Sequence, residues 1–129
     1  MRRLLAATAL LSISAAVPAH AQGGPSFDCA KASTAIERTI CKSAELAKAD
    51  RDLASAYAAL LAKFTGAAKE HLQKDQQRWT ANRNRACTGE DIASCLKARY
   101  ENRQSLLRVY AAGAYPFISE QAIVKAGKV

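Results

Sequence analysis

Apolar residues recur every three or four positions along most of the chain. This spacing predicts α-helices, because it places side chains on one helical face. The clearest stretch covers residues 76–110, where two helical halves are separated by one break flanked by Cys87 and Cys95. No segment shows the strict alternation typical of a strand. We therefore predict an all-α fold in which residues 76–110 form a helical hairpin.

Helix-end signals divide the chain further. Thr34 and Glu37 have the spacing of a capping box, in which the two side chains satisfy free backbone amides at a helix start. Ser43 is the expected N-cap of a second helix, which Thr65 and Gly66 end. We predict a small bundle of one short and three longer antiparallel helices. Their ranges are about residues 35–41, 44–64, 68–87 and 92–112, and Gly113 and Pro116 end the last helix.

The first 21 residues have the order of a secretory signal peptide. Arg2 and Arg3 precede an apolar run, and small residues lead to an expected cleavage site after Ala21. The run is too short for an ordinary membrane span, so no transmembrane anchor is expected. No cysteine stands directly after the cleavage site, so no lipid anchor is expected either. We predict a periplasmic or secreted protein with a flexible leader (22–28), a helical domain (29–113) and a tail (114–129) that carries an apolar patch.

Four cysteines in an exported domain of this size predict two disulfides. Pairing Cys29 with Cys41 is feasible, because the helix between them rises roughly 10 Å while the five preceding residues extend about 16 Å. The remaining pair is then Cys87 with Cys95. The pairings Cys29–Cys87 with Cys41–Cys95, and Cys29–Cys95 with Cys41–Cys87, stay open. A zinc site is disfavoured, since the pairs are separated by eleven and seven residues and not by two to four.

Basic residues outnumber acidic ones. Of 19 Lys and Arg against 11 Asp and Glu, removal of Arg2 and Arg3 leaves 17 against 11, a net charge of +6. The excess lies in residues 76–108, which favours anionic partners such as envelope polymers. The exported location argues against nucleic acid as a partner.

Three charges stand on inner helix faces where leucine would be expected: Asp50, Arg83 and Arg103. Buried charges need partners, and antiparallel registers place Asp50, Arg83 and Arg99 at one level. The same registers set Trp79 opposite Arg103, which favours a cation–π contact. We predict a charge and aromatic network that holds the fold. The alternative is that Trp79 and the arginines are partly exposed and form a recognition surface.

No catalytic constellation emerges from the sequence. His71 stands in a polar helix segment, and the serines lack a nucleophile-elbow motif. There is no glycine-rich phosphate loop and no metal-ligand pair at helical spacing. We therefore predict a binding protein without catalytic residues, metal or cofactor, and keep a small hydrolase with an unrecognised site as a remote third reading.

The combined pattern resembles the LprI-like lysozyme-inhibitor N-terminal domain, a family of small exported bacterial helical domains. The resemblance covers about residues 27–107. Its residues are Asp28, Cys29, Glu37, Ile40, Cys41, Leu46, Asp50, Leu53, Tyr57, Gln76, Trp79, Arg83, Cys87, Cys95 and Arg103. The resemblance implies a helical fold and inhibition of lysozyme, so lysozyme or another envelope-acting protein is the expected partner.

Common lysozymes are strongly basic, so a net charge of +6 opposes long-range association. Inhibition then requires a local acidic or apolar patch that enters the enzyme cleft. Candidate acidic segments are residues 89–91 and the neighbourhood of Glu45 and Asp52. The alternative function is a cationic envelope module that binds anionic wall or outer-membrane polymers. Its candidate residues are Arg78, Arg85, Lys97 and Arg108.

Overall fold

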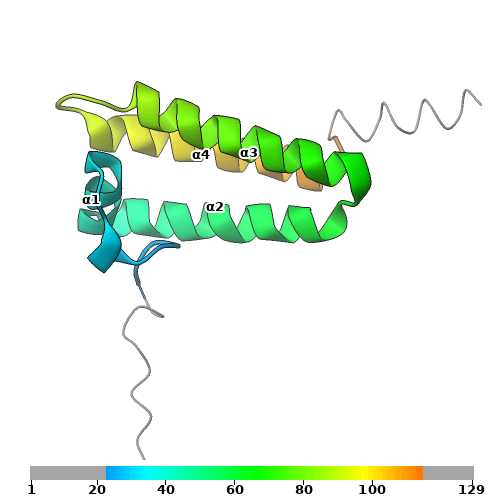
Figure 1. Ribbon diagram of the computed structural model, residues 1–129, viewed down its shortest axis with the longest axis horizontal. Coiled ribbons are helices and arrows are strands. Elements are labelled where there is room, and N and C mark those ends of the chain that lie inside the picture. The colour runs from blue at the N-terminus through cyan, green and yellow to red at the C-terminus, as the bar shows by residue number, and fades with distance from the viewer. Residues whose placement is uncertain (1–22, 115–129) are drawn as a thin grey trace, which may run out of the picture.

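Three long helices lie side by side, and a short helix packs across one end of them (Figure 1). This computed structural model describes residues 23–114. The elements are a 3-10 turn η2 (Cys29–Lys31) and the helices α1 (Ala35–Lys42), α2 (Ala44–Lys63), α3 (Gly66–Ala86) and α4 (Ile92–Ala111). The predicted all-α bundle of one short and three longer helices is confirmed. The predicted signal peptide, Pro116 and the apolar patch of the tail lie outside the described residues.

The predicted helix ends are set by the expected caps. Thr34 and Glu37 form the capping box of α1. The Ser43 hydroxyl accepts a hydrogen bond of 3.2 Å from the amide of Leu46 at the start of α2. Gly113, with φ of 96°, ends α4 in a Schellman arrangement, because its amide bonds to the carbonyl of Tyr110 and the next amide bonds to that of Val109.

The connection between α2 and α3 is shorter than predicted. Gly66 was expected to terminate the second helix, but it is the first residue of α3, and Thr65 is the N-cap. Gly66 has φ of 55°, a left-handed conformation that a glycine adopts without steric cost. This conformation reverses the chain over two residues, so α3 starts two residues before the predicted position.

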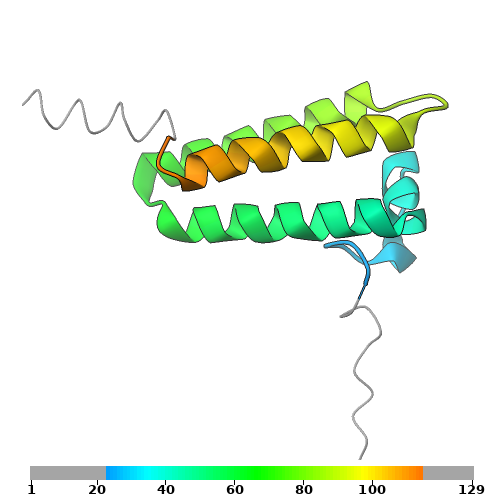
Figure 2. The same ribbon diagram turned by 180° about the vertical axis from the view of Figure 1, so that it is seen from behind.

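Helices α2 and α4 make the main apolar interface. They run in the same direction, with α3 antiparallel to both (Figures 1 and 2). Apolar side chains at three- and four-residue spacing on α2 meet those of α4, and burying each such side chain stabilises the fold by about 1.5–3 kcal/mol. The buried cluster consists of Ile36, Ile40, Leu46, Leu53, Leu60, Phe64, Ala68, Leu72, Cys87, Leu96, Tyr100 and Leu107.

Helix α3 contributes little to this core. Within it only Ala68 and Leu72 are buried, both near its N-terminal end. The rest of its inner face carries Gln76, Trp79 and Arg83, which are partly buried. Helix α3 is therefore held largely by polar and aromatic contacts. None of the described helices is apolar over enough length to cross a membrane.

Each disulfide joins two cysteines that are consecutive among the four cysteines of the chain. Cys29 is bonded to Cys41, with 5.9 Å between their Cα atoms, and Cys87 is bonded to Cys95, with 5.4 Å. The preferred pairing is confirmed, and the two alternative pairings are excluded. The first bond ties η2 to the end of α1, and the second closes the turn between α3 and α4.

Candidate binding site

Asp50 lies at the centre of a buried polar network. Its side chain is 8% exposed. Oδ2 accepts hydrogen bonds from the amide of Ser26 at 2.6 Å and from the Ser26 hydroxyl at 2.5 Å. The other oxygen, Oδ1, accepts from the Tyr100 hydroxyl at 2.8 Å. These bonds join α2 and α4 to the segment before η2, which was expected to be a flexible leader.

Asp50 and Arg83, which the predicted registers place at one level, form no direct ion pair. Instead, Nη1 of Arg83 donates to the Tyr100 hydroxyl at 2.9 Å, and this hydroxyl donates onward to Asp50. The register placed the two charges at the right level. It could not show that the long side chain of Tyr100, from α4, occupies the space between α2 and α3. Burial of this phenol raises the pKa of Tyr100 well above its ordinary value.

Arg99 lies apart from this network. It directly precedes Tyr100 on α4, so its side chain points about 100° away from that of Tyr100. Arg99 is exposed, and within residues 23–114 its side chain makes no hydrogen bond or ion pair. The placement of Arg99 beside Asp50 and Arg83 is therefore corrected.

Two arginines flank Trp79. The guanidinium carbon of Arg83 lies 5.2 Å from the Trp79 ring centroid, and that of Arg103 lies 5.9 Å away. The Trp79 and Tyr100 rings meet with their centroids 5.7 Å apart. Trp79 itself is partly buried. Its exposure is therefore intermediate between that of a core residue and that of an exposed recognition residue, the two alternatives considered from the sequence. The contact of Arg103 with Trp79 matches the predicted register.

Arg103 has two further partners that the register did not include. It is only 3% exposed, and its Nη1 lies 2.7 Å from Oδ2 of Asp75. Its Nε and Nη2 both donate to Oε1 of Gln76, at 3.0 and 2.9 Å. Asp75 and Gln76 stand one helical turn before Trp79 on α3. The sequence signal for them is their position one helical turn before Trp79, the residue predicted to lie opposite Arg103.

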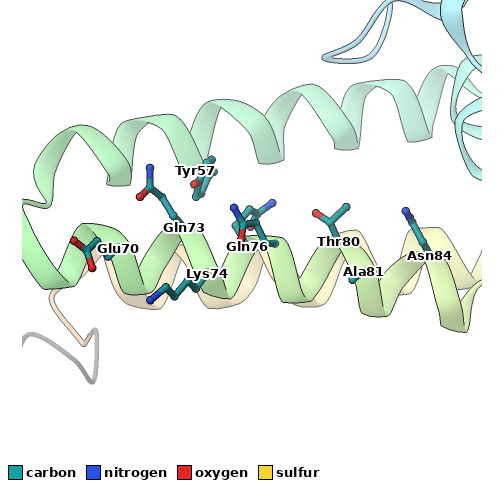
Figure 3. A pocket seen from close by; sticks show the side chains of 9 residues that line it. Tyr57, Glu70, Gln73, Lys74, Gln76, Thr80, Ala81 and Asn84 are labelled. Carbon is teal, nitrogen blue, oxygen red and sulfur yellow. The ribbon is translucent and has the colours of Figure 1, made fainter.

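A groove of about 770 Å³ runs between α2 and α3. Tyr57 lines it from α2, and Figure 3 shows Gln73, Thr80 and Asn84 pointing from α3 toward α2. Burial raises the pKa of Tyr57, so its phenol is neutral at physiological pH. The other lining residues are Glu70, Lys74, Gln76, Gln77 and Ala81. The sequence pattern did not predict this groove, because the groove depends on how α3 lies beside α2.

The turn between α3 and α4 forms an acidic loop, residues 88–91, that projects from one end of the bundle (Figures 1 and 2). All four residues are exposed. Within residues 23–114, neither Glu90 nor Asp91 takes part in an ion pair. The other candidate acidic groups do: Glu45 lies 2.8 Å from Lys97, and Asp52 lies 2.5 Å from Lys48. The geometry therefore favours residues 89–91 among the predicted acidic segments.

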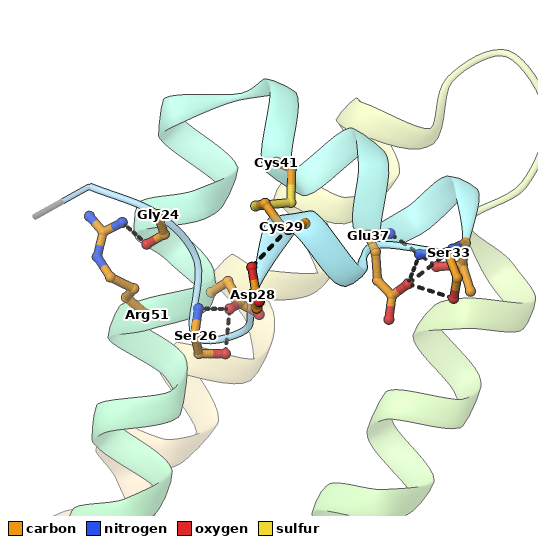
Figure 4. Close-up of a disulfide and its surroundings, with 11 residues drawn as sticks. Gly24, Ser26, Asp28, Cys29, Ser33, Glu37, Cys41 and Arg51 are labelled. Atoms are coloured by element: carbon orange, nitrogen blue, oxygen red, sulfur yellow. Dashed lines mark hydrogen bonds between the residues drawn. A yellow bond between two sulfur atoms is a disulfide. The ribbon is translucent and has the colours of Figure 1, made fainter. Parts of the chain in front are cut away.

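The segment around the first disulfide, residues 24–42, is called the N-terminal clasp here. Its polar groups are bonded internally or to α2 (Figure 4). Oδ1 of Asp28 accepts from the amide of Ala30 at 2.9 Å, and Arg51 on α2 donates to the carbonyl of Gly24. Glu37 accepts from the amides of Ser33 and Thr34, and the Thr34 backbone bond is the main cause that lowers the pKa of Glu37.

The described residues hold no arrangement suited to metal chemistry. Residues 23–114 contain no group of three or more His, Cys, Asp or Glu side chains placed to hold an ion. All four cysteines are in disulfides, and His71 is exposed. The surface features of the described residues are an acidic loop at one end of the bundle and an amide-lined groove along α3.

Comparison with known proteins places these features in a family. The sequence profile of the family described as "Lysozyme inhibitor LprI" matches residues 29–113. The chain is also 30% identical over 103 residues to proteins named "Lipoprotein LprI" from Mycobacterium bovis and from two strains of Mycobacterium tuberculosis. These alignments cover 78% of this chain and 51% of each relative, so the chain spans about half the length of the curated relatives it matches. No solved structure matches it significantly.

Proposed function

The chain belongs to the lysozyme inhibitor LprI family, and on this premise we propose that it is an exported, non-enzymatic protein that binds lysozyme and inhibits it. The observation that carries the proposal is the extent of the family match. Residues 29–113 include all four helices, both disulfides and the acidic loop. The proposal thus concerns the whole bundle and not a short motif.

The acidic loop is the element that we expect to contact lysozyme. The chain and common lysozymes are both basic, so most of the surface is repelled by the enzyme. Glu90 and Asp91 are adjacent exposed carboxylates, and no ion pair within residues 23–114 offsets their charge. A negative group at the tip of a positive molecule gives local attraction and orients the encounter.

The second disulfide supports this role, because it limits the conformations open to the loop. The Cys87–Cys95 bond spans the seven residues 88–94, which are the acidic loop and the first turn of α4. Gly89, with φ of 84°, allows the sharp reversal at its centre. A loop that is ordered before binding loses less conformational entropy on association, which favours affinity.

Export to the periplasm or the medium, without a lipid anchor, is part of the proposal. It is supported by the signal-peptide pattern of residues 1–21 and by the two disulfides, which persist in oxidising compartments. The relatives carry the name lipoprotein, so attachment is the point to test. Fractionation of cells that produce the chain should find it soluble after removal of membranes, and recovery in the membrane fraction would contradict this part.

The test of inhibition is a titration of the purified protein against the wall-lytic activity of a basic lysozyme. We expect saturable inhibition that ends near one molecule of protein per molecule of enzyme. The substitution Glu90→Gln should weaken inhibition about three- to ten-fold, in line with the loss of one favourable charge at an interface.

The matched control is Glu101→Gln, which removes one exposed carboxylate on α4, away from the loop. It should leave inhibition unchanged. If the two variants inhibit equally well, the loop is not the contact. If the unaltered protein shows no inhibition at any ratio, lysozyme is not its target.

The alternative function is binding of anionic envelope polymers. It has weaker support, because most of its candidate basic residues already contact other side chains of the protein. Lys97 is engaged by Glu45, and its pKa is raised mainly by that hydrogen bond. Arg85 donates to Asn82, and Arg108 donates to Ser105. Three of the four candidate cations thus already have partners on the protein.

A further inference from the structure

We propose that the groove between α2 and α3 binds an uncharged oligosaccharide. This inference goes beyond lysozyme inhibition and uses none of residues 88–91. The groove volume of about 770 Å³ falls in the range of roughly 300–1,000 Å³ that small-molecule sites occupy. Its lining combines four side-chain amides, one aliphatic hydroxyl and one phenol ring. These are Gln73, Gln76, Gln77, Asn84, Thr80 and Tyr57.

Two of the amides are held in a defined orientation by arginines. Arg103 donates from Nε and Nη2 to the side-chain oxygen of Gln76, at 3.0 and 2.9 Å. Arg83 makes the same fork to the side-chain oxygen of Asn84, at 3.0 and 2.9 Å. A guanidinium has only donors, so the atom it contacts must be the amide oxygen. The NH₂ groups of Gln76 and Asn84 therefore remain available as donors to a ligand.

These donors lie along the length of the groove. Gln73, Gln76, Thr80 and Asn84 are spaced three or four residues apart, which places them in one row on α3. Figure 3 shows Tyr57 across from this row, on α2. This row of donors, of which Gln76 and Asn84 are held by arginines, lies beside an aromatic ring. The arrangement suits an extended ligand that carries many acceptor oxygens and whose rings have flat apolar faces.

The charges and apolar groups of the lining favour a neutral sugar. Glu70 and Lys74 are the charged lining residues, and their charges are opposite, so the groove has no net preference for an ion. An extended peptide would need apolar pockets for its side chains. Apart from the Tyr57 ring, the apolar surface of the lining comes from the methyl groups of Ala81 and Thr80 and from the methylene groups of the longer side chains. A polyhydroxylated chain meets these conditions better than a peptide or a polyanion.

Trp79 gives a direct readout. It is the single tryptophan of the chain and lies within one turn of Gln76 and Thr80 on α3. The full-length mature protein is titrated with a tetramer of β-1,4-linked N-acetylglucosamine, and Trp79 fluorescence is recorded alongside calorimetry. A tetramer of galacturonic acid and a neutral tetrapeptide are titrated in parallel. We expect saturable binding of the neutral sugar and none of the other two at the same concentrations.

Variants locate the binding. Gln73→Ala and Tyr57→Phe each remove one polar group from the lining, and each should weaken sugar binding about two- to ten-fold. Asn102→Ala, an exposed amide on α4 outside the groove, is the matched control and should bind as the unaltered protein does. Circular dichroism establishes that all three are folded.

Several results would overturn the proposal. They are absence of sugar binding, equal binding by the Gln73 variant and the Asn102 control, and tighter binding of the peptide or the acidic sugar. Lysozyme inhibition is measured on the same variants. Loss of sugar binding with inhibition intact would separate this groove from the acidic loop.

Discussion

Both disulfides close short loops, with sequence separations of 12 and 8 residues, yet their surroundings differ. Around Cys29–Cys41, the chain is fixed to the bundle by Ser26, whose amide and hydroxyl both bond to Asp50, and by the capping box of α1. Around Cys87–Cys95, the loop that the bond closes is exposed at all four positions from 88 to 91. The first disulfide sits inside a hydrogen-bonded segment, whereas the second bounds a projecting one.

This difference suggests a division of roles. A loop whose polar groups already bond to its own protein has little left to offer a partner. The acidic loop keeps its carboxylates available and receives order from the disulfide and the two helices that flank it. We infer that the N-terminal clasp stabilises the fold and that the acidic loop recognises the target.

Removal of either disulfide is expected to have the largest effect on the free energy of unfolding. Comparing the two removals should show which disulfide matters for stability alone and which also matters for binding lysozyme. The pair Cys29→Ala with Cys41→Ala, and the pair Cys87→Ala with Cys95→Ala, should each lower the free energy of unfolding by about 3 kcal/mol, since this cost varies only with the logarithm of the loop length. Inhibition of lysozyme by the folded fraction should fall only for the second pair. Chemical denaturation and the wall-lysis assay measure the two quantities.

Equal loss of inhibition in both double variants, at a temperature where both are folded, would argue against the division of roles. Loss restricted to the Cys29 and Cys41 variant would reverse it.

The next largest effect is expected at Asp50. The substitution Asp50→Ala removes the acceptor of the buried Tyr100 hydroxyl and releases Ser26. We expect a loss of about 1–3 kcal/mol in the free energy of unfolding, since a buried donor is left unsatisfied. Asp52→Ala is the control, because Asp52 is about half exposed and pairs only with Lys48, and it should cost below about 1 kcal/mol. Equal losses for the two variants would show that Asp50 does not anchor the N-terminal clasp.

Tyr100→Phe tests the link between α3 and the rest of the network. The change should cost about 1 kcal/mol at neutral pH, because one buried hydrogen bond to Asp50 is lost. It should also change the alkaline response. Burial raises the folded-state pKa of Tyr100, so the stability tied to its neutral phenol is present below its ordinary value of 10.0 and is lost as pH rises above it.

Denaturation at pH 8 and pH 11 measures this response. The stability of the unaltered protein should fall more steeply over this interval than that of the Tyr100→Phe variant. Part of the slope should persist in the variant, because burial also raises the pKa of Tyr57 and Tyr110. Identical slopes would mean that the Tyr100 phenol is not buried as the structure has it.

The smallest effect is expected at Glu37 in the capping box. Its folded-state pKa is lowered, chiefly by the backbone hydrogen bond from Thr34. The stability tied to its carboxylate is therefore present above the ordinary value of 4.5 and is lost as pH falls below it. Glu37→Gln should lower the melting temperature slightly at pH 7, and the difference should vanish by pH 3. A difference that grows in acid would contradict this assignment.

Local signals predicted much of the fold from the sequence. The capping box at Thr34 and Glu37, the Ser43 cap and the Gly113 terminus depend on neighbouring residues, and the structure contains all three. Chain reach showed that Cys29 and Cys41 can pair, and the structure, which contains this pair, decides among the three pairings that the sequence left open. The apolar stripe of α2 could be read from its spacing alone.

The candidate site depends on side-chain positions that the spacing of residues along the sequence does not determine. Periodicity gives the level of Asp50 and Arg83, but not the position of the Tyr100 hydroxyl between them. Ser26 lies outside any periodic segment, so its bonds to Asp50 left no sequence signal. The groove arises from how α3 sits beside α2, which a residue pattern on one helix cannot specify.

Hydrogen exchange on the complex with lysozyme tests the central claim most directly. The protein is labelled alone and with excess enzyme, and backbone protection is compared between peptides that cover residues 87–95 and residues 24–42. We predict that binding slows exchange in residues 87–95 and leaves residues 24–42 unchanged. Slower exchange in residues 24–42 with no change at the acidic loop would contradict the account.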